Sequence, residues 1–398
     1  MTAGIEGYDW LITSGPDRTG QDRQDMSSHT RPKLTAGELS SLLGILPAVA
    51  GTILSFFLSN SWRQWRQGIL CARSLRRNAA ASFGTAISLL KPRQLRVFVS
   101  NTTGKTVADY CAANDLMHQP ILVENTDGFP PAMLHFIDCK LAQKGPILLY
   151  FHGGGFIVPL HSPAFAVSSA RIARASPVLL EYTLVPECEY PGQLAQAVAA
   201  LRLILKYRKP SEIIIGGESA GGNMALAVLA HLQQPKPGIT PLALPASDKF
   251  RGAVAISPRT ANLATAESFR TNSGKDFMSE HSLVAITASW KPEADVWAAP
   301  VLAAKAFWDG FRAEKLLLVV GADEVYRDDV CHTAKMMGAR EVGVGSLDAK
   351  AKAPRAHGPD AQLIVCPNEM HCQASLDMSV GIRDGYMTRG VAGWLARC

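Results

Sequence analysis

The chain has no paired cysteines, few aromatic residues and no internal repeat. Its eight cysteines form no C-x-x-C pair, and aromatic residues make up only 7% of its 398 residues. Scattered cysteines indicate neither a zinc site nor a disulfide framework, so we expect a reducing compartment inside the cell. No internal repeat is evident, which argues against a solenoid. The cysteines are Cys71, Cys111, Cys139, Cys188, Cys331, Cys366, Cys372 and Cys398.

Charge is also scarce, at 19% of the residues, and the net charge of +6 is modest. A cluster of arginines without an interleaved acid lies between residues 63 and 77. Such a cluster fits a contact with an anionic membrane or nucleic acid, or simply a solvated helix face. No DNA- or RNA-binding motif accompanies it, so we expect no nucleic-acid partner. The arginines are Arg63, Arg66, Arg73, Arg76 and Arg77.

Short apolar runs of strand length recur from about residue 120 onward. The first three follow each other without a helix, which suggests antiparallel strands at one edge of a sheet. Later runs alternate with helical stretches, which predicts an α/β fold with a mostly parallel central sheet flanked by helices. The expected strands are 121–123, 133–137, 147–151, 178–182, 213–215, 253–256, 316–320 and 363–365, and the expected helices include 194–206 and 225–232.

A G-x-S-x-G pentapeptide stands between one of these expected strands and the helical stretch that follows it. It consists of Gly217, Glu218, Ser219, Ala220 and Gly221. A serine at a sharp strand-to-helix turn projects its hydroxyl over the sheet edge, and larger neighbours would collide in the bend. A glycine–serine turn alone needs no chemistry, but this context predicts that Ser219 is an enzyme nucleophile.

Three consecutive glycines follow the expected strand at 147–151, in the sequence His152, Gly153, Gly154 and Gly155. Consecutive glycines lose much conformational entropy on folding, and close approach of the backbone to a ligand is a common reason to keep them. Their amides could point at an oxyanion, whereas the simpler interpretation is a flexible turn.

Together these segments resemble the hormone-sensitive-lipase-like branch of the α/β-hydrolase superfamily. The pattern of that branch is HGGG followed by G-D/E-S-A-G-G, which this chain has at residues 217–222. Residues 181–191 resemble its Y-x-L-x-P-E-x-x-x-P segment. The similarity runs from about Pro146 to the C-terminus and is closest to fungal steryl-acetyl-hydrolase-like members, which also carry a long N-terminal region. The resemblance implies an α/β-hydrolase fold and a serine mechanism that needs no metal or organic cofactor.

A nucleophilic serine needs an imidazole base and an acid that orients the imidazole. In α/β-hydrolases the chain order is serine, acid, histidine. Residues 321–328 follow an expected strand and resemble the family's G-x-D-x-L-R-D, and by position Asp323 matches the acid. Asp328 and Asp329 are the fallback, although their charges also suit a helix N-terminus.

Only three histidines follow Asp323 in the sequence: His332, His357 and His371. His332 falls within an expected helix, and His357 lies in a polar stretch without periodicity. His371 follows the last expected strand through a short loop, which is where the base belongs in this family. We therefore predict that His371 is the base.

The resemblance also assigns roles within the glycine motif. It implies an oxyanion hole made by the amides of Gly154, Gly155 and Ala220. In the family the histidine of the motif shapes the loop by hydrogen bonding and transfers no proton, so we expect the same of His152. The residues that support the motif are His152, Gly153, Gly217 and Gly221.

Residues 39–58 form a long uncharged apolar stretch ahead of the hydrolase pattern. Their apolar residues recur at helical spacing, and small or polar residues occupy the other side. Three interpretations stay open: a cap helix over the active site, an interfacial helix and a membrane anchor. A secretory signal is not expected, because the apolar stretch starts far into the chain and no compact basic region precedes it.

These patterns predict a division of the chain into three parts. Residues 1–37 are polar and are expected to be a disordered tail. Residues 38–118 are expected to form a helical cap or a membrane-associating region, and residues 119–398 the catalytic domain. Within that domain, residues 258–300 are predicted to contribute to the cap and residues 338–360 to form a surface insertion.

The sequence therefore predicts a cytoplasmic serine hydrolase that cleaves a carboxylic ester of an apolar, small or medium substrate through an acyl-enzyme. Two alternatives remain. The same site could promote condensation, cyclisation, lactonisation or acyl transfer on a polyketide-like substrate in fungal natural-product biosynthesis. A non-catalytic ligand-binding receptor is the other, although plant gibberellin receptors, which resemble the family, lack the histidine that this chain has. Peripheral membrane contact through residues 39–58 stays open, and the sequence is silent on the oligomeric state.

Overall fold

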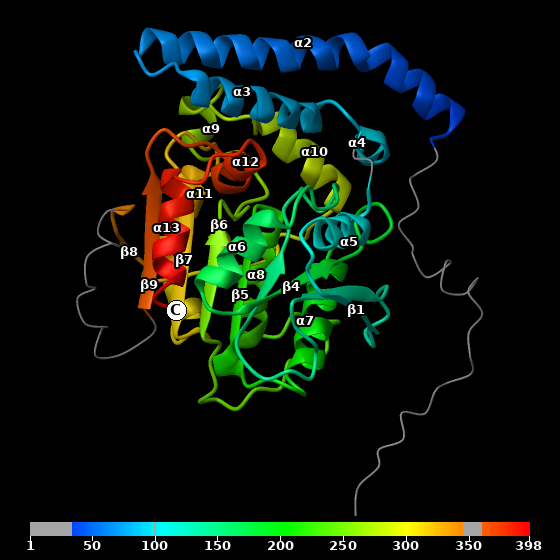
Figure 1. The fold of residues 1–398 in the computed structure, drawn as a ribbon, viewed down its shortest axis with the longest axis vertical. Helices are drawn as coiled ribbons and strands as arrows, with labels where there is room; N and C mark the ends of the chain where they lie inside the picture. Colours follow the sequence, from blue (N-terminus) through cyan, green and yellow to red (C-terminus); the bar gives the residue numbers. More distant parts are fainter. Residues whose placement is uncertain (1–33, 99–100, 345–359) are drawn as a thin grey trace, which may run out of the picture.

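The computed structural model describes residues 34–98, 101–344 and 360–398. They form a layered α/β structure in which helices cover both faces of a central sheet (Figure 1). The predicted α/β fold with a mostly parallel sheet is confirmed. The expected tail, apart from residues 34–37, and most of the expected insertion at 338–360, including His357, lie outside the described residues.

The sheet has nine strands in the order β1-β2-β4-β3-β5-β6-β7-β9-β8. β1 and β2 pair antiparallel, as do β2 and β4, and all other neighbours are parallel. The antiparallel edge expected from the first apolar runs is therefore present. The strands are β1 (His118–Val123), β2 (Ala132–Ile137), β3 (Ile147–Phe151), β4 (Ser176–Glu181), β5 (Ile213–Glu218), β6 (Gly252–Ile256), β7 (Lys315–Gly321), β8 (Arg340–Glu341) and β9 (Asp360–Cys366).

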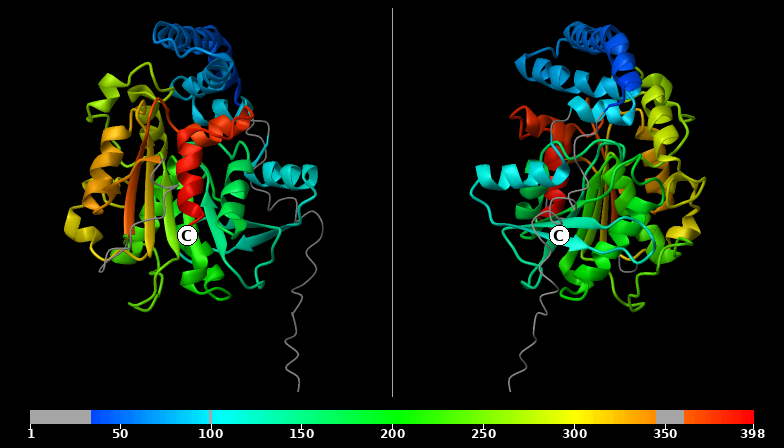
Figure 2. Two further views of the ribbon diagram at one scale, coloured as in Figure 1. Left: turned by 60° about the vertical axis from the view of Figure 1, so that its left-hand side comes forward. Right: turned by 90° about the vertical axis from the view of Figure 1, so that its right-hand side faces the viewer.

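Helices pack on each face of the sheet (Figure 2). One face carries α7, α8 and α11, and the other carries α5, α6, α12 and α13. The helices are α2 (Ala36–Arg66), α3 (Ala72–Gly84), α4 (Pro92–Phe98), α5 (Thr103–Ala113), α6 (Ala164–Ile172), α7 (Gly192–Ile204), α8 (Ala220–Gln233), α9 (Ser268–Thr271), α10 (Glu280–Trp290), α11 (Arg327–Met336), α12 (Gln373–Ser379) and α13 (Tyr386–Leu395), with 3-10 turns at η1 (Thr85–Ser88), η2 (Pro210–Glu212), η3 (Pro300–Leu302) and η4 (Lys305–Trp308).

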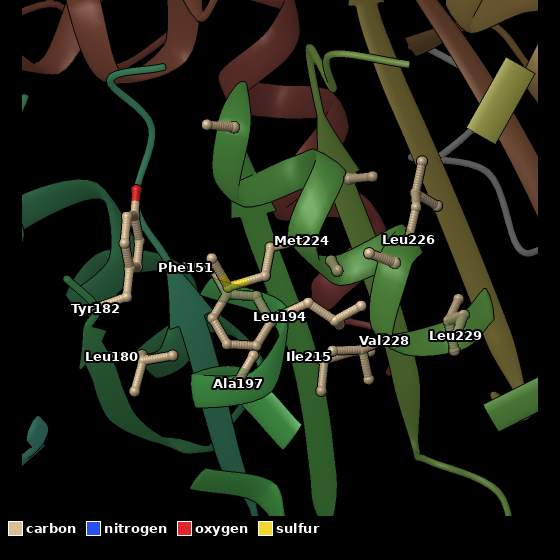
Figure 3. Packing of buried hydrophobic residues seen from close by; sticks show 14 of the residues in the cluster. Phe151, Leu180, Tyr182, Leu194, Ala197, Ile215, Met224, Leu226, Val228 and Leu229 are labelled. Atoms are coloured by element: carbon tan, nitrogen blue, oxygen red, sulfur yellow. The ribbon is translucent and has the colours of Figure 1, made fainter. Parts of the chain in front are cut away.

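The central strands are buried along nearly their whole length. All five residues of β3 are buried, as expected for a parallel strand covered on both faces. Figure 3 shows Leu194 of α7 and Met224 of α8 packed with Phe151 of β3 and Ile215 of β5. Burying each such side chain contributes about 1.5–3 kcal/mol. This packing fixes the ends of β3 and β5, and therefore the two loops that follow these strands.

The N-terminal helices lie across one end of the molecule, next to α9, α10 and α12 (Figures 1 and 2). α2 begins with a capping box, in which the Thr35 hydroxyl accepts from the Glu38 amide and the Glu38 carboxylate accepts from the Thr35 amide. The helix packs on α3 and η1. It also reaches the segment before α10, because the Asn60 side-chain amide donates to the Lys275 carbonyl at 3.3 Å.

The apolar residues of α2 do not all face the protein. Leu42, Val49 and Phe56 are buried, but Leu54 and Leu58 are more than half exposed. The single apolar face expected at residues 39–58 is therefore divided between the protein and the surface. By length and composition α2 could cross a membrane, with a mean hydropathy of 2.0 over an 18-residue window, of which 17% is buried. The large apolar residues exposed on α2 are Leu39, Leu43, Leu46, Leu54, Leu58, Trp62 and Trp65.

Candidate active site

Ser219 occupies the sharp turn between β5 and α8, as the pentapeptide predicts. Its backbone has φ 54° and ψ −117°, a conformation that costs a non-glycine residue about 1–3 kcal/mol. The turn approaches β3 closely, because a Cβ at Gly221 would lie 1.9 Å from the Phe151 carbonyl oxygen. A Cβ at Gly217 would lie 2.4 Å from the Gly221 carbonyl oxygen. Only glycine fits at these two positions.

The structure brings Ser219 and His371 together from positions far apart in the sequence. His371 Nε2 lies 2.9 Å from Ser219 Oγ, and His371 Nδ1 lies 3.1 Å from Glu324 Oε2. All three residues are buried. A carboxylate only accepts hydrogen bonds, so Nδ1 carries the ring proton and the Ser219 hydroxyl donates to Nε2. An imidazole held in this way can take a proton from the serine.

Glu324 is held in place by donors on its second oxygen. Oε1 accepts from the Ser257 hydroxyl at 2.5 Å and from the Gly321 amide at 2.6 Å. The Ser257 oxygen in turn accepts from the Cys372 amide at 3.0 Å. The carboxylate is thus tied to the ends of two strands, β6 and β7, and to the loop that carries His371.

The prediction that Asp323 is the acid partner of His371 is corrected by this geometry. Asp323 Oδ2 lies 3.6 Å from Arg63 Nη1 of α2. The chain turns after β7, where the Glu324 amide donates to the Gly321 carbonyl, and consecutive side chains in this turn point in different directions. The turn directs Glu324 toward His371 and Asp323 toward α2. Two adjacent acids in one turn offer no sequence signal that tells them apart.

The other candidates from the sequence lie away from this chain of contacts. Asp328 and Asp329 are in the first turn of α11, where acidic residues suit the helix dipole. The Asp328 carboxylate accepts from the Ser268 amide at 2.8 Å. His332 also lies in α11, as expected.

Asp276, which the sequence analysis did not single out, lies against the same cluster. It belongs to the irregular segment between α9 and α10, and its carboxylate accepts from the backbone amides of Val325 at 3.0 Å and of His371 at 3.3 Å. Burial raises its pKa to about 7, although the His371 charge lowers it. A lone aspartate in an irregular segment carries no motif by which a sequence could reveal it.

The electrostatics around His371 favour its protonated form. Burial lowers the pKa of His371, but the hydrogen bond and charge of Glu324, with the charges of Asp276 and Glu218, outweigh burial and raise the pKa overall. Glu218 is half-buried; the loss of solvation raises its pKa, and it accepts a hydrogen bond from Ser375. The site therefore stabilises an imidazolium, the form that results when His371 takes the serine proton.

The glycine loop lies beside the serine turn. A Cβ at Gly153 would come within 3.3 Å of the Ser219 Cβ, while Gly154 and Gly155 have φ of 104° and 63°, which favour glycine. His152 contacts the loop itself, with Nδ1 2.7 Å from the Gly153 carbonyl. Its ring stacks on Tyr182, whose hydroxyl donates to the His152 carbonyl at 2.8 Å. These contacts hold His152 against the backbone of the glycine loop.

Residues of the segment 258–300 lie over the glycine loop and the histidine. Ile286 of α10 lies about 3.0 Å from where a Cβ of Gly155 would be. Trp290 stacks on Phe156 with ring centroids 4.4 Å apart, and Phe277 meets the His371 ring edge-on at 5.7 Å. Within the described ranges no group of three or more His, Cys, Asp or Glu could hold a metal ion.

Comparison with known proteins agrees with this geometry. A family model described as the alpha/beta hydrolase fold matches residues 148–353, about half of the chain. An acetyl-hydrolase from Streptomyces hygroscopicus is 31% identical over 195 residues, which cover 47% of this chain and 60% of that protein. The versiconal hemiacetal acetate esterase of Aspergillus parasiticus is 26% identical over 189 residues, which cover 47% and 51%.

The chain thus matches roughly half the length of these relatives. Among solved structures, an esterase/lipase from an uncultured bacterium is similar with a TM-score of 0.54 and 25% identity, covering 71% of this chain and 85% of that one. The serine turn and the glycine loop lie within the residues that the family model matches. The chain belongs to the alpha/beta hydrolase fold family, in agreement with its resemblance to the hormone-sensitive-lipase-like branch.

Proposed function

We propose that this protein is a serine hydrolase that cleaves carboxylic esters through an acyl-enzyme. The observation that carries the proposal is the unbroken line of contacts from the Ser219 hydroxyl through the His371 imidazole to the Glu324 carboxylate, at 2.9 and 3.1 Å. In this line the Glu324 carboxylate accepts from His371 Nδ1, so that Nε2 of the neutral imidazole can accept the serine proton.

In the proposed reaction each residue takes one step. Ser219 Oγ attacks the ester carbonyl while its proton passes to His371 Nε2, and Glu324 stabilises the imidazolium that forms. The amides of Gly154, Gly155 and Ala220 hold the oxyanion. His371 then gives the proton to the departing alcohol. A water molecule, deprotonated by the same imidazole, attacks the acyl-enzyme and releases the acid.

The substrate that we propose is a small or medium ester with an apolar body. The rings of Phe156 and Trp290 and the side chain of Ile286 pack over the glycine loop, where the substrate carbonyl must sit. Relatives named acetyl-hydrolase and acetate esterase support an acetyl group as the acyl part.

Ser219→Ala tests the reaction. We expect hydrolysis of 4-nitrophenyl acetate and butyrate by the wild type, and a loss of about 10⁴-fold or more in kcat for the variant. Mass analysis of the products separates hydrolysis, which adds water, from acyl transfer or condensation, which does not. Wild-type-like turnover by folded Ser219→Ala protein would rule the proposal out.

We also propose that α2 contacts a membrane surface. Seven large apolar side chains of this helix, among them Leu54, Leu58 and Trp62, are exposed on the outer side. Arg66 is exposed in the last turn of the helix and suits anionic headgroups. Buried side chains on the inner side hold the helix to the protein, so it lies along the surface of the fold.

Flotation with vesicles of neutral and anionic phospholipid tests this contact. The wild type is expected to float with the vesicles, more strongly when they are anionic, and the triple variant Leu43→Ser, Leu54→Ser, Leu58→Ser to remain behind. Equal flotation of both proteins, or of neither, would contradict the membrane contact. Esterase activity on a water-soluble ester serves as the check that the triple variant is folded.

A further inference from the structure

Arg259 is a buried cation next to the nucleophile. Its side chain is 1% exposed, and it follows β6 on the loop that continues from Ser257. The Arg259 amide donates to the Ser219 carbonyl at 3.2 Å, and the Arg259 carbonyl accepts from the Asn223 side chain at 2.8 Å. The backbone of Arg259 is therefore locked to the serine turn and to the first turns of α8.

The guanidinium has too few acceptors for its donors. Nη2 donates to the Thr287 hydroxyl of α10 at 2.8 Å, and the Trp290 ring lies 4.8 Å from Cζ. Nε and Nη1, which carry three N–H groups, have no hydrogen-bond partner in the described part of the chain. Nor does any carboxylate of those residues form an ion pair with it. Burial lowers the pKa of Arg259 to about 10, so it remains charged at neutral pH.

A second buried donor faces the same region. The Tyr326 hydroxyl is buried and, among the described residues, also has no hydrogen-bond partner. Burial raises the pKa of the Tyr326 hydroxyl, and the nearby charge of Arg259 lowers it. The Tyr326 ring meets the His371 ring edge-on, with ring centroids 5.2 Å apart. Trp290, under the guanidinium, stacks on Phe156 beside the glycine loop. The Arg259 guanidinium thus contacts α10, and the Tyr326 ring contacts the catalytic candidate His371.

We infer that Arg259, with Tyr326, binds a carboxylate carried by the substrate ester. This inference rests on the proposed esterase function and adds a charged group to its apolar substrate class. A buried charge without an acceptor is costly, and a carboxylate would supply both the missing charge and acceptor oxygens. Since the proposed acyl part is small, the carboxylate belongs to the alcohol part of the ester.

Acetate esters of hydroxybenzoates test the inference, because a matched neutral ester exists for each. The probes are 3- and 4-acetoxybenzoate and their methyl esters, which differ mainly in charge. The readout is the ratio of kcat/KM for the carboxylate to kcat/KM for its methyl ester. This ratio cancels any general loss of catalytic efficiency that a substitution brings.

We expect the wild type to prefer at least one carboxylate over its methyl ester. Arg259→Met should lower that ratio by about thirtyfold or more, since the partner of a buried charge is removed. Arg259→Lys, which keeps the charge but loses the planar set of donors, should give an intermediate ratio. Arg270→Met, at an exposed arginine of the same segment, should leave the ratio unchanged.

Equal ratios in the wild type and in Arg259→Met would overturn the inference and make the guanidinium a structural group. If Arg259→Met does not fold, Tyr326→Phe replaces it, with an expected fall of several-fold in the same ratio; no fall would overturn the inference.

Calorimetry with Ser219→Ala protein separates this inference from the proposed function. We expect 3- or 4-hydroxybenzoate to bind more tightly than its methyl ester, even if no ester is hydrolysed. Hydrolysis of all four esters without preference for charge, together with equal binding, would leave the esterase proposal standing and refute the carboxylate site.

Discussion

We predict that Glu324, and not its neighbour Asp323, is the acid that orients His371. We compare Glu324→Gln with Asp323→Asn, which each replace one carboxylate by its amide. Glu324 accepts from Ser257 and Gly321 on one oxygen and faces His371 with the other. An amide oxygen that keeps the first two contacts turns the amide NH₂ toward His371 Nδ1.

That NH₂ group donates where the native carboxylate accepts. His371 Nδ1 must then accept, so Nε2 carries the ring proton and can no longer receive one from Ser219. A triad held in this tautomer loses about 10⁴-fold in kcat. Asp323 instead forms a partly exposed ion pair with Arg63 at 3.6 Å, and such pairs contribute about 0–1 kcal/mol. Asp323→Asn should therefore change kcat by no more than about a few-fold.

The assay is steady-state hydrolysis of 4-nitrophenyl acetate, after near-ultraviolet circular dichroism has shown that both variants are folded. Active-site titration in the same samples corrects for inactive protein. A larger loss in Asp323→Asn than in Glu324→Gln would refute the assignment of the acid. Equal small losses in both variants would refute the claim that an acid side chain orients His371 for catalysis.

Three further outcomes are expected. The acid limb of the kcat/KM profile should have its midpoint above 6.5, because the raised pKa of His371 keeps the base protonated to higher pH; a midpoint below 6.5 would contradict the stabilised imidazolium. Gly221→Ala should lower the free energy of unfolding by about 3 kcal/mol, measured in urea, because the new methyl group would overlap the Phe151 carbonyl; an unchanged midpoint would refute this packing. The raised pKa of Asp276 means that the folded state binds its proton more tightly than the unfolded state, so the stability that this group contributes falls as pH rises from about 4 to about 7. Asp276→Ala should therefore make the free energy of unfolding fall less steeply over this pH range, and an unchanged dependence on pH would contradict the raised pKa.

Much of the fold was predictable because the central strands are buried on both faces. Continuous apolar runs such as 147–151 and 316–320 leave little choice but a covered parallel strand. The two-residue strand β8 could not be found in this way, since Arg340 and Glu341 are exposed and too few to show a period. The apolar face of α2 was misjudged because its apolar residues extend around the helix, and only tertiary packing decides which of them are buried.

The site residues, too, could be predicted from the sequence only in part. Ser219 and His371 follow from a turn that tolerates only small neighbours and from the order of groups along the chain. The acid does not, because Asp323 and Glu324 share one turn and differ only in the direction of their side chains. Arg259 and Asp276 lie in irregular segments, where no periodicity or motif distinguishes a buried charge from a solvated one.

The nucleophilic character of Ser219 is tested most directly by covalent labelling. We predict that a fluorophosphonate probe forms one adduct with the folded wild-type protein and that peptide mass spectrometry locates it on Ser219. The adduct should form much more slowly in Glu324→Gln, whose imidazole carries the wrong tautomer. Labelling at another residue, or no labelling of folded wild-type protein, would contradict the proposed enzyme.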